Sequence, residues 1–511
     1  MGLKHWRAAA CAALLLPAAA GAQDVTLTAR DGAITLSGTL QGFDGEFYRV
    51  DTSYGLLTVD GEGVICAGPG CPDLTAPKAL IRITGAPDAG FGLLPGVLRA
   101  FAHSRGLVFR LEPGDGEFAA QVTDPVKGEV LADITFTPAG PAASRAALAE
   151  GQAELVVASL PEDGLTAKVL ALDALIPIVA VDNPLPQIAT PDLARALSGE
   201  IDNWQLLGGP DMPLVLHALD EDTTLQEALS ARLGRSVVAG IRHPDLASLA
   251  AAVARDPYAL AVTGQSAQGG ARALTLTDSC GFPLLATSMA VKAEDYPLSV
   301  PVYLVLPRRR LPLFAREFLE YLSTPSAHSA VAQAGYVDRA PSRAPLTEDG
   351  QRLINAIRGA GTEVALADLQ QLAGAMAGAD RLSLTFRFED GSSTLNTSSR
   401  ENLSDLAQLL EVGQFKGEQL VFAGFSDGSG DGATNLALSR NRAEAVAAAL
   451  RLAAPALPPD QPAPLIEAYG EALPMACDTT VAGRQVNRRV ELWLRPFTGK
   501  PATAPTGILV P

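Results

Sequence analysis

The chain has 511 residues, of which 39 are Lys or Arg and 56 are Asp or Glu, giving a formal net charge of −17. This length predicts two to four domains at roughly 100–200 residues each, and an apolar content of 48% excludes general disorder. The acidic balance argues against nucleic-acid binding and against attachment to an anionic bilayer face, because both need a basic surface. The 48 Gly and 37 Pro residues follow no repeat, which excludes a collagen-like chain.

Residues 1–22 predict an export signal. Lys4 and Arg7 precede an apolar stretch over residues 8–20, and Ala20-Gly21-Ala22 fits the small-residue pattern of a cleavage site. Cys11 leaves a lipoprotein signal open as an alternative. The apolar stretch is too short to cross a bilayer as a helix, so we expect a mature protein in an exported compartment.

Four cysteines follow the signal, and an oxidising compartment favours their pairing. Cys66 and Cys71 flank Ala-Gly-Pro-Gly, a turn that can bring the two side chains into bridging distance, so we predict a disulfide that staples this loop. Cys280 and Cys477 form either a long-range pair or two buried thiols, and the sequence leaves both readings open.

Residues 23–78 predict a small β-module. Short runs typical of strands cover 25–29, 34–40, 46–51 and 56–59. Asp-Gly pairs, which favour hairpin turns, separate them at 31–32, 44–45 and 60–61.

The rest of the chain predicts an α/β multidomain protein. Residues 79–343 alternate apolar strands with amphipathic helices, which indicates parallel sheets with ligands at the carboxyl ends of the strands. Residues 344–380 are rich in Ala and Leu and predict a helical connector. Residues 381–497 predict a third unit of βαβαβ order, and residues 498–511 a Pro-rich, disordered tail.

The densest polar motif lies in the C-terminal unit. Asp427 follows an apolar strand in a Gly-rich loop, and Arg442 falls in the early turns of the next helix. A carboxylate and a guanidinium held side by side can clamp a zwitterion, since one takes its ammonium and the other its carboxylate. An Asp–Arg pair that merely joins loop to helix is the alternative.

This unit resembles the OmpA-like peptidoglycan-binding domain. The motifs that carry the resemblance are Ser426-Asp427-Gly428-Ser429-Gly430, Asn435, Leu438-Ser439-Arg440-Asn441-Arg442-Ala443, Gly470-Glu471-Ala472-Leu473-Pro474 and Asn487-Arg488-Arg489-Val490. The resemblance implies binding of the diaminopimelate of the cell-wall stem peptide. Its ligands fall on Asp427 and Arg442, with Asn435, Ser426 and Arg489 as further binding residues. Where the family has His-Thr, this chain has Phe425-Ser426.

Two other functions of the same loop are excluded because required residues are missing. Gly424-x-Ser426-x-Gly428 matches a hydrolase nucleophile elbow, but the last histidine is His328, so none follows the serine to act as its base. The calcium-loop pattern that starts at Asp427 has Leu438 at its twelfth position instead of Glu. The remaining histidines are scattered without ligand spacing. We therefore expect no catalytic residues, no metal site and no cofactor.

The central region, over about residues 79–340, resembles periplasmic phosphate-binding proteins of ABC importers. The stretches that carry the resemblance are Leu80-Ile81-Arg82-Ile83-Thr84-Gly85, the run from Leu172 through Asp182-Asn183-Pro184 and Ser198-Gly199-Glu200-Ile201-Asp202-Asn203-Trp204, Tyr296-Pro297-Leu298-Ser299 and Ala334-Gly335-Tyr336-Val337. The resemblance implies a two-lobed clamshell that closes on a small ligand. Its hinge is expected near 173–178 and 263–274.

The ligand loop of this region departs from the family. Arg-x-x-x-Ser-Gly-Thr of the family corresponds to 217–223, where His217 replaces Arg, and Glu221 and Asp222 replace Ser-Gly before Thr223. Acidic side chains repel an oxyanion, so we expect no phosphate binding. Glu221 and Asp222 either cap a helix or face a cationic ligand. The candidate solute-binding residues are Thr84, Ser159, His217, Glu221, Asp222 and Thr223.

Together these features predict a non-enzymatic binding protein of a Gram-negative periplasm. Its OmpA-like domain would tether it to peptidoglycan, and its clamshell would bind a small solute. The alternative is an envelope scaffold whose clamshell is a protein-interaction surface. The expected partners are peptidoglycan, a small solute and outer-membrane or envelope proteins, and no nucleic acid.

Overall fold

The computed structural model describes residues 25–497 except 31, 33, 44–46, 62, 72–77, 361–362, 390–391, 393 and 456–460. The predicted signal peptide (1–22) and tail (498–511) lie outside the described residues, as do Asp31, Asp44 and Gly45 of the predicted turns. The chain divides into two compact units, one of residues 1–78 with 313–317 and one of the remainder.

The N-terminal unit is an antiparallel sheet, as its alternating pattern predicts. Its strands are β1 (Val25–Ala29), β2 (Thr35–Phe43), β3 (Phe47–Thr52), β4 (Gly55–Asp60) and β5 (Val64–Ala67), in the order β4-β3-β2-β1-β5. Alternate side chains of β1, β2 and β3, such as Leu27 and Val50, are buried in a small core. The predicted Cys66–Cys71 disulfide is confirmed, with 5.7 Å between the Cα atoms, and it closes the loop after β5.

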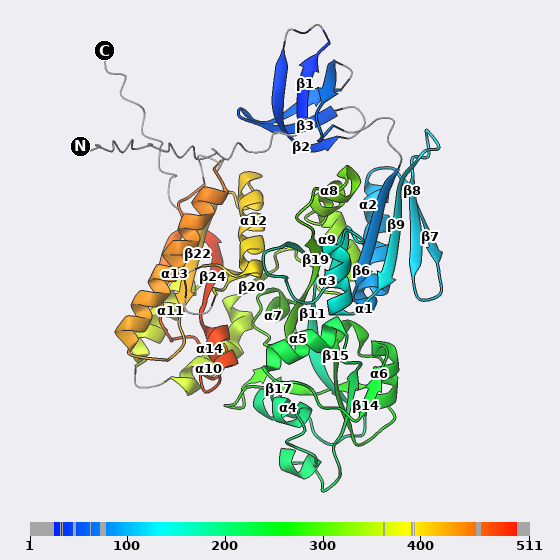
Figure 1. Cartoon of the computed structure of the whole chain (residues 1–511). Coiled ribbons are helices and arrows are strands. Elements are labelled where there is room, and N and C mark those ends of the chain that lie inside the picture. The colour runs from blue at the N-terminus through cyan, green and yellow to red at the C-terminus, as the bar shows by residue number, and fades with distance from the viewer. Residues whose placement is uncertain are drawn as a thin grey trace, which may run out of the picture. The chain divides into compact units, whose positions relative to one another are not determined.

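The second unit contains two lobes built on one eleven-stranded mixed sheet (Figure 1). The first lobe is made of β6 (Ala79–Gly85), β7 (Val108–Pro113), β8 (Phe118–Thr123), β9 (Val130–Pro138), β10 (Leu155–Ala158), β19 (Ser299–Leu306), the first part of β11 (Thr166–Val179), and helices α1 (Pro87–Gly92), α2 (Leu94–Ser104), α3 (Pro141–Ala149) and α9 (Pro325–Gln333). Helix α8 (Leu313–Tyr321) follows β19.

The second lobe follows β11. It is made of β12 (Gln187–Ala189), β13 (Val215–Leu219), β14 (Ile241–His243), β15 (Ala259–Gly264), β16 (Arg272–Ala273), β17 (Thr275–Thr277), β18 (Pro283–Leu284), α4 (Thr190–Leu197), η1 (Trp204–Leu207), α5 (Thr224–Leu233), α6 (Leu246–Val253), η2 (Gln265–Ala267) and α7 (Ser288–Lys292).

Strand β11 joins the lobes, because its first part pairs with β19 and its last part with β15 and β16. These pairings are antiparallel, whereas β6 with β9 and β10, and β13 with β14 and β15, are parallel as expected. The chain returns to the first lobe just before β19, where Leu175 N–H donates to Leu298 O. The expectation of a second hinge at 263–274 is therefore wrong, since β15 and β16 stay in the second lobe.

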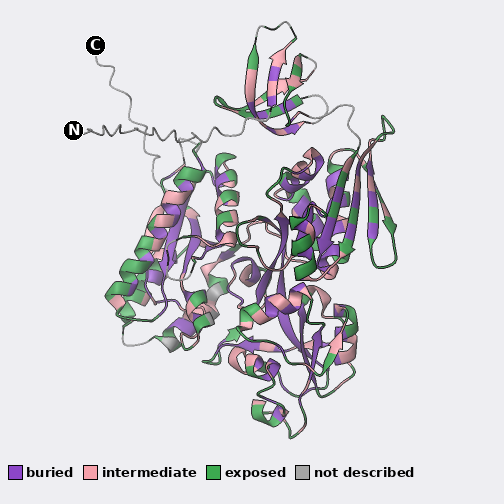
Figure 2. Cartoon of the chain, viewed as in Figure 1, coloured by how far each residue is buried: buried purple, intermediate pink, exposed green. Residues whose placement is uncertain are grey.

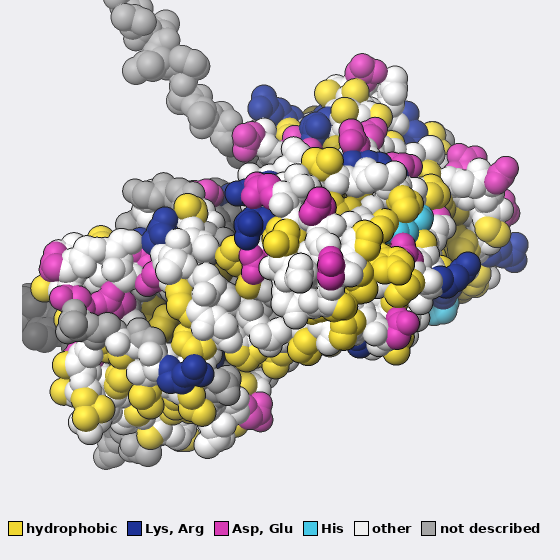
Figure 3. All heavy atoms as spheres, turned by 90° about the horizontal axis from the view of Figure 1, so that it is seen from below, with side chains coloured by type: hydrophobic (Ala, Val, Ile, Leu, Met, Phe, Trp, Pro, Cys, Tyr) yellow, Lys and Arg dark blue, Asp and Glu magenta, His cyan; other side chains and the backbone are white. Residues whose placement is uncertain are grey.

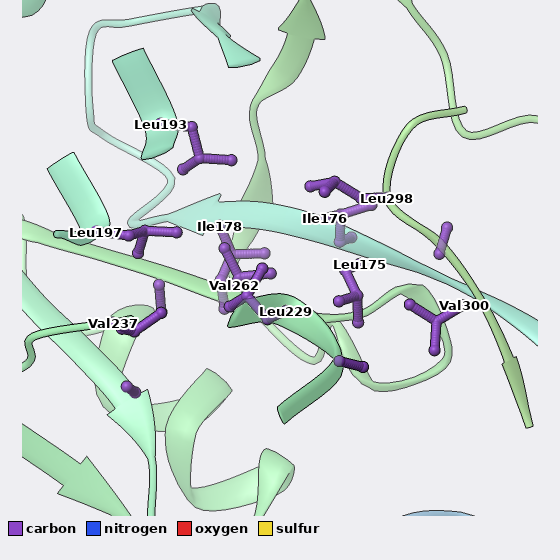
Figure 4. Packing of buried hydrophobic residues seen from close by; sticks show 14 of the residues in the cluster. Leu175, Ile176, Ile178, Leu193, Leu197, Leu229, Val237, Val262, Leu298 and Val300 are labelled. Carbon is purple, nitrogen blue, oxygen red and sulfur yellow. The ribbon is translucent and has the colours of Figure 1, made fainter. Parts of the chain in front are cut away.

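The core of the two lobes is continuous across β11. Figure 4 shows Leu175, Ile176 and Ile178 of this strand among Leu193, Leu229 and Val262, all within one buried cluster. Trp204 is also fully buried, and its indole N–H donates to Tyr258 O at 3.0 Å. The Trp therefore has a packing role. In Figure 2 the buried residues lie along the central strands and on the inner faces of the helices.

The C-terminal domain is a five-stranded sheet in the order β20-β21-β24-β22-β23. Its elements are β20 (Arg343–Pro345), η3 (Leu346–Asp349), α10 (Gly350–Gly359), α11 (Leu366–Met376), β21 (Asp380–Phe386), α12 (Thr397–Glu411), β22 (Glu418–Phe425), α13 (Gly432–Ala453), β23 (Leu465–Ala468), α14 (Val481–Asn487) and β24 (Arg489–Pro496).

Helices cover both faces of this sheet. Residues of α12 and α13 pack on one face, and residues of α10 and α11, including Leu372 and Met376, pack on the other around Phe425 and Trp493. The segment 344–380 is therefore a second helical layer of this domain instead of a connector.

Charged side chains of both signs are interspersed with apolar ones on the face drawn in Figure 3. Among the residues that the structure describes, no helix combines the length and the apolarity needed to cross a bilayer.

Candidate functional site

The loop after β22 and the start of α13 form the C-terminal candidate site. Gly424 lets the strand and the helix approach closely, because a Cβ there would collide with the carbonyl of Ser439. Asp431 caps α13 by accepting from Thr434 N–H at 2.9 Å. The strand end and the first turns of the helix are thus held together, and the charges of Asp427 and Arg442 interact.

Asp427 is 8% exposed and its two carboxylate oxygens are engaged differently. Oδ1 accepts from Ser429 N–H at 3.0 Å, and Oδ2 pairs with Arg488 Nη1 at 3.1 Å. Burial raises the pKa of Asp427, but the hydrogen bonds from Ser429 and Arg488 outweigh it and hold the pKa below its usual range. The carboxylate is therefore ionised at neutral pH.

Arg442 lies half-buried on α13, with its guanidinium 5.6 Å from the centre of the Phe388 ring. Its Nη1 is buried and has no hydrogen-bond partner among the described residues. Burial lowers the pKa of Arg442 and the charge of Arg488 lowers it further, whereas Asp427 opposes the shift. A buried cationic N–H without an acceptor is costly, so this guanidinium is disposed to receive an anion.

Two more of the sequence-predicted residues lie buried nearby with unpaired side-chain atoms. In the described part of the chain, Ser426 Oγ and Asn435 Nδ2 make no hydrogen bond, although both residues are nearly inaccessible. Ser426 is fixed through its backbone, whose N–H donates to Gly470 O at 2.8 Å.

An acidic group that the sequence analysis missed borders the same loop. Gly428 N–H donates to Asp478 Oδ2 at 2.7 Å, and a Cβ at Gly428 would meet the carboxylates of both Asp478 and Glu471. Burial raises the pKa of Glu471, and the nearby charges of Asp478, Glu363 and Asp427 raise it further. The site therefore has an acidic side and a guanidinium side.

Arg489, expected to bind ligand, is a core residue instead. It is 0% exposed, its Nε pairs with Glu491 at 2.7 Å, and its Nη2 donates to Leu473 O at 2.9 Å. Burial lowers its pKa to about 10, partly offset by Glu491. The neighbouring Arg488 is the arginine that reaches Asp427.

The candidate solute-binding residues Thr84, Ser159 and His217 have different surroundings in the two lobes. Thr84 Oγ1 donates to Thr137 O at 2.8 Å within the first lobe, and Ser159 lies in the bend after β10. His217 lies in the second lobe, 3.0 Å from His243 Nε2 and 3.3 Å from Asp256 Oδ2. These contacts give Thr84 and His217 structural partners.

The acidic loop before α5 has three different roles. Glu221 pairs with Arg242 at 2.9 Å, and Thr223 caps α5 by accepting from Gln226 N–H at 3.3 Å. The Asp222 carboxylate lies against Gly140, the residue that precedes α3, and leaves no room there for a Cβ. In the described part of the chain, Asp222 is the residue of this loop that lies against the opposite lobe. No group of three His, Cys, Asp or Glu suited to a metal ion occurs in this part of the chain.

Comparison with known families identifies both regions. Residues 387–488 match the model of the OmpA family, and residues 117–326 match a domain of the PBP superfamily. The chain therefore contains an OmpA-family domain and a periplasmic-binding-protein-like domain. No curated protein matches the chain.

Solved structures similar to the chain include two from phosphate transport. One, from Clostridium perfringens, is titled a phosphate ABC transporter substrate-binding protein with bound phosphate; it is 18% identical, with 51% of this chain and 99% of that chain covered and a TM-score of 0.41. An ABC-type phosphate transport receptor from Vibrio cholerae is 17% identical, with 50% and 99% covered and a TM-score of 0.39.

The two families are binding and structural families rather than enzyme families. The OmpA-family domain points to association with peptidoglycan, and the periplasmic-binding-protein-like domain points to solute binding. Both suggest a protein of the cell envelope.

Proposed function

We propose that the C-terminal domain tethers the protein to peptidoglycan by gripping the zwitterionic end of a diaminopimelate stem peptide between Asp427 and Arg442. The observation that carries this proposal is the buried Nη1 of Arg442, which has no acceptor among the described residues although it lies near the ionised Asp427.

The charges of the site match those of the ligand. The carboxylate of the amino-acid end accepts two N–H bonds from Arg442 in the planar geometry that guanidinium favours. The ammonium lies toward Asp427, with the carboxylates of Glu471 and Asp478 on the same side of the loop. Arg488 holds the Asp427 carboxylate in position through Oδ2.

Ser426 and Asn435 complete the recognition. Their unpaired Oγ and Nδ2 are a hydroxyl and an amide donor that hydrogen-bond the ligand's polar groups. Filling buried polar groups in this way discriminates strongly against analogues that lack the matching atoms.

The test is pull-down of the purified mature protein by diaminopimelate-type sacculi. Asp427→Ala and Arg442→Ala are each expected to weaken binding at least tenfold, about 1.4 kcal/mol or more. Arg440→Ala is the matched control, because Arg440 is exposed on the same helix, and it is expected to bind normally. Lysine-type peptidoglycan, which lacks the second carboxylate, is expected to bind weakly. Unchanged pull-down by both site variants would refute the grip.

For the clamshell, capture of a small solute is the function that its fold supports. A second candidate, an envelope scaffold without a small ligand, is favoured by one observation: the Asp222 carboxylate lies against Gly140 of the opposite lobe. A thermal-shift panel of phosphate, amino acids, amines and muropeptides separates the two. A shift with a solute that persists in Arg442→Ala supports capture, and no shift with any solute supports the scaffold.

A further inference from the structure

The amino-terminal end of helix α3 in the first lobe is covered by a side chain of the second lobe. Gly140 precedes α3 and offers no side-chain cap. The Asp222 carboxylate lies over it, so closely that Gly140 has no space for a Cβ. A negative charge is favourable at the start of a helix, where unpaired N–H groups and the helix dipole are positive. The chain itself thus supplies an anion at this helix end.

An ion pair on the next turn also joins the lobes. Arg145 of α3 lies 3.2 Å from Glu227 of α5 in the second lobe and 3.1 Å from Glu162 of the first lobe. The hydrogen bonds that Arg145 donates to the two glutamates raise its pKa. Exposed pairs of this kind are individually weak, so the contact adds to the Asp222 contact instead of replacing it.

A reciprocal contact lies on the other side of the clamshell. Asp88, in the first turn of α1 in the first lobe, lies close to the backbone of Leu246, the first residue of α6 in the second lobe. Close to the hinge, Ser266 Oγ donates to Asp173 Oδ2 at 2.7 Å. Each lobe therefore places a carboxylate at the start of a helix of the other.

The C-terminal domain contacts the first lobe through helix α12. Lys168 of β11 pairs with Glu401 at 3.2 Å, and Arg339 pairs with Glu401 at 3.3 Å and with Asp405 at 2.6 Å. All four side chains are largely shielded from solvent. This helix is therefore attached to the lobe that contains α1 and α3.

The same domain contacts the second lobe at another surface. Asp295, in the segment that follows α7, pairs with Arg381 at 2.7 Å and with Arg387 at 3.2 Å, and Arg387 also donates to Glu294 O at 2.8 Å. The Cys280–Cys477 disulfide adds a covalent link between the second lobe and the C-terminal domain. One domain thus bridges both lobes.

From these contacts we propose that the clamshell is held closed by the chain itself. The Asp222 carboxylate is a built-in anion at the start of α3, the Arg145–Glu227 pair adds to this contact, and the C-terminal domain bridges the two lobes. Opening would separate Asp222 from α3, break the Arg145–Glu227 pair, and break either the α12 contacts or the Asp295 contacts. The closed form is then the resting form without any solute. This proposal does not depend on the peptidoglycan grip.

The test measures the distance between the lobes in the full mature protein. Spin labels at Glu112→Cys in the first lobe and Arg255→Cys in the second, both exposed positions, report the distance by pulsed electron resonance. The native disulfides are checked first by peptide mapping. The lock variant is Asp222→Ala/Arg145→Ala. The control is Glu221→Ala/Arg195→Ala, which also removes one acidic and one basic side chain. The partners of these two residues, Arg242 and Asp192, lie in the second lobe, so the control breaks no contact between the lobes.

The expected result is one narrow distance in the otherwise unmodified protein and in the control, unchanged by 10-fold excess inorganic phosphate or a mixture of amino acids. The lock variant is expected to broaden the distribution toward longer distances. Two populations in the otherwise unmodified protein, or a shift caused by phosphate or amino acids, would overturn the proposal. So would a folded lock variant whose distances match the control. If the lock variant fails to fold, the distances in the spin-labelled protein that lacks the lock substitutions still test whether the clamshell is closed without solute.

Discussion

The closed clamshell disfavours the ionised form of Asp88. Burial raises its pKa to about 6, and the charges of Asp245 and Asp173 add to the shift, while the Leu246 N–H only partly offsets it. The other titratable group facing it is Tyr336, whose pKa burial raises first and the two aspartates raise further. Because the pKa is higher in the folded state, the contribution of Asp88 is full below about pH 4 and is lost as pH rises through 6.

Replacing Asp88 by Asn is therefore expected to stabilise the protein at pH 7.5 and to change little at pH 4.5. The shift in the pKa of Asp88 corresponds to a change of roughly 3 kcal/mol at most in the free energy of unfolding. Thermal unfolding at both pH values measures the difference. Asp115→Asn, in the exposed turn between β7 and β8, is the control and is expected to be neutral at both. Equal effects of Asp88→Asn at the two pH values would contradict the assignment.

Glu491 is the other residue on which the fold depends. It is 0% exposed and accepts from Arg489, while Arg352 and Arg381 complete a buried group of guanidiniums around it. Burial alone would raise its pKa, but the three arginines lower it far below its usual range. The carboxylate neutralises cations that are largely shielded from water.

Glu491→Gln is expected to cost about 3–5 kcal/mol of unfolding free energy, because it leaves buried charge uncompensated. Chemical denaturation measures the change. Glu444→Gln, on the exposed side of α13, should stay within about 0.5 kcal/mol of the unmodified protein. A loss below 1 kcal/mol for Glu491→Gln would show that water or relaxation compensates the arginines.

At the scale of single elements, helices α10 and α11 show what the sequence could and could not indicate. Their Ala- and Leu-rich composition predicts helices, and the structure has them. Composition does not say which surface they cover, because that depends on the exposed face of a sheet formed by β21, β22 and β24, whose residues come later in the chain. The helices belong to the sheet's second face.

Leu372→Ala tests this assignment. Leu372 of α11 is 0% exposed, so the substitution is expected to destabilise the protein by about 2–5 kcal/mol through lost burial and a cavity. Leu366→Ala on the same helix is the matched control, because Leu366 is 69% exposed. A free connector would give equal, small effects in denaturation for both.

The Asn487-Arg488-Arg489-Val490 motif shows a second limit. The sequence places two arginines at the start of a strand, and the motif alone predicts Arg489 as the binding residue. Successive side chains at a strand point to opposite sides, so only one of them can reach the site. The strand register, with Arg489 opposite Phe425, decides that Arg489 packs inward over this ring. Asp427 and Arg442, by contrast, could be expected near one another from sequence, because a strand end and the next helix start are local neighbours; their charges interact, but the arginine that pairs with Asp427 is Arg488.

For the molecule as a whole, the main result is that the clamshell and the C-terminal domain belong to one compact unit. Sequence resemblance predicts each domain separately. The contacts of Asp295 and Glu401 join residues that are far apart along the chain, so no local sequence pattern predicts them. The Cys280–Cys477 link, which the sequence left open, is a bond between these two domains with a sequence separation of 197.

Removing this bond in Cys280→Ser/Cys477→Ser is expected to lower the free energy of unfolding by up to about 5 kcal/mol, because the unfolded chain regains the freedom of a long loop. Chemical denaturation measures the loss. Under reducing conditions, the unmodified protein is expected to lose at least this amount, because the Cys66–Cys71 disulfide opens as well. The control, Cys66→Ser/Cys71→Ser, opens only a short loop in the N-terminal unit and is expected to cost less. Equal stability with and without the long-range bond would contradict this expectation.

The same bond also fixes an order of assembly. Cys477 is translated long after Cys280, so the first thiol must stay reduced and available while nearly 200 further residues are made. Cys66 and Cys71, only five residues apart, are ready for oxidation almost at once. Of these two disulfides, the Cys280–Cys477 bond is thus the later to become possible, and free thiol at Cys280 reports molecules in which the second lobe and the C-terminal domain are not yet joined.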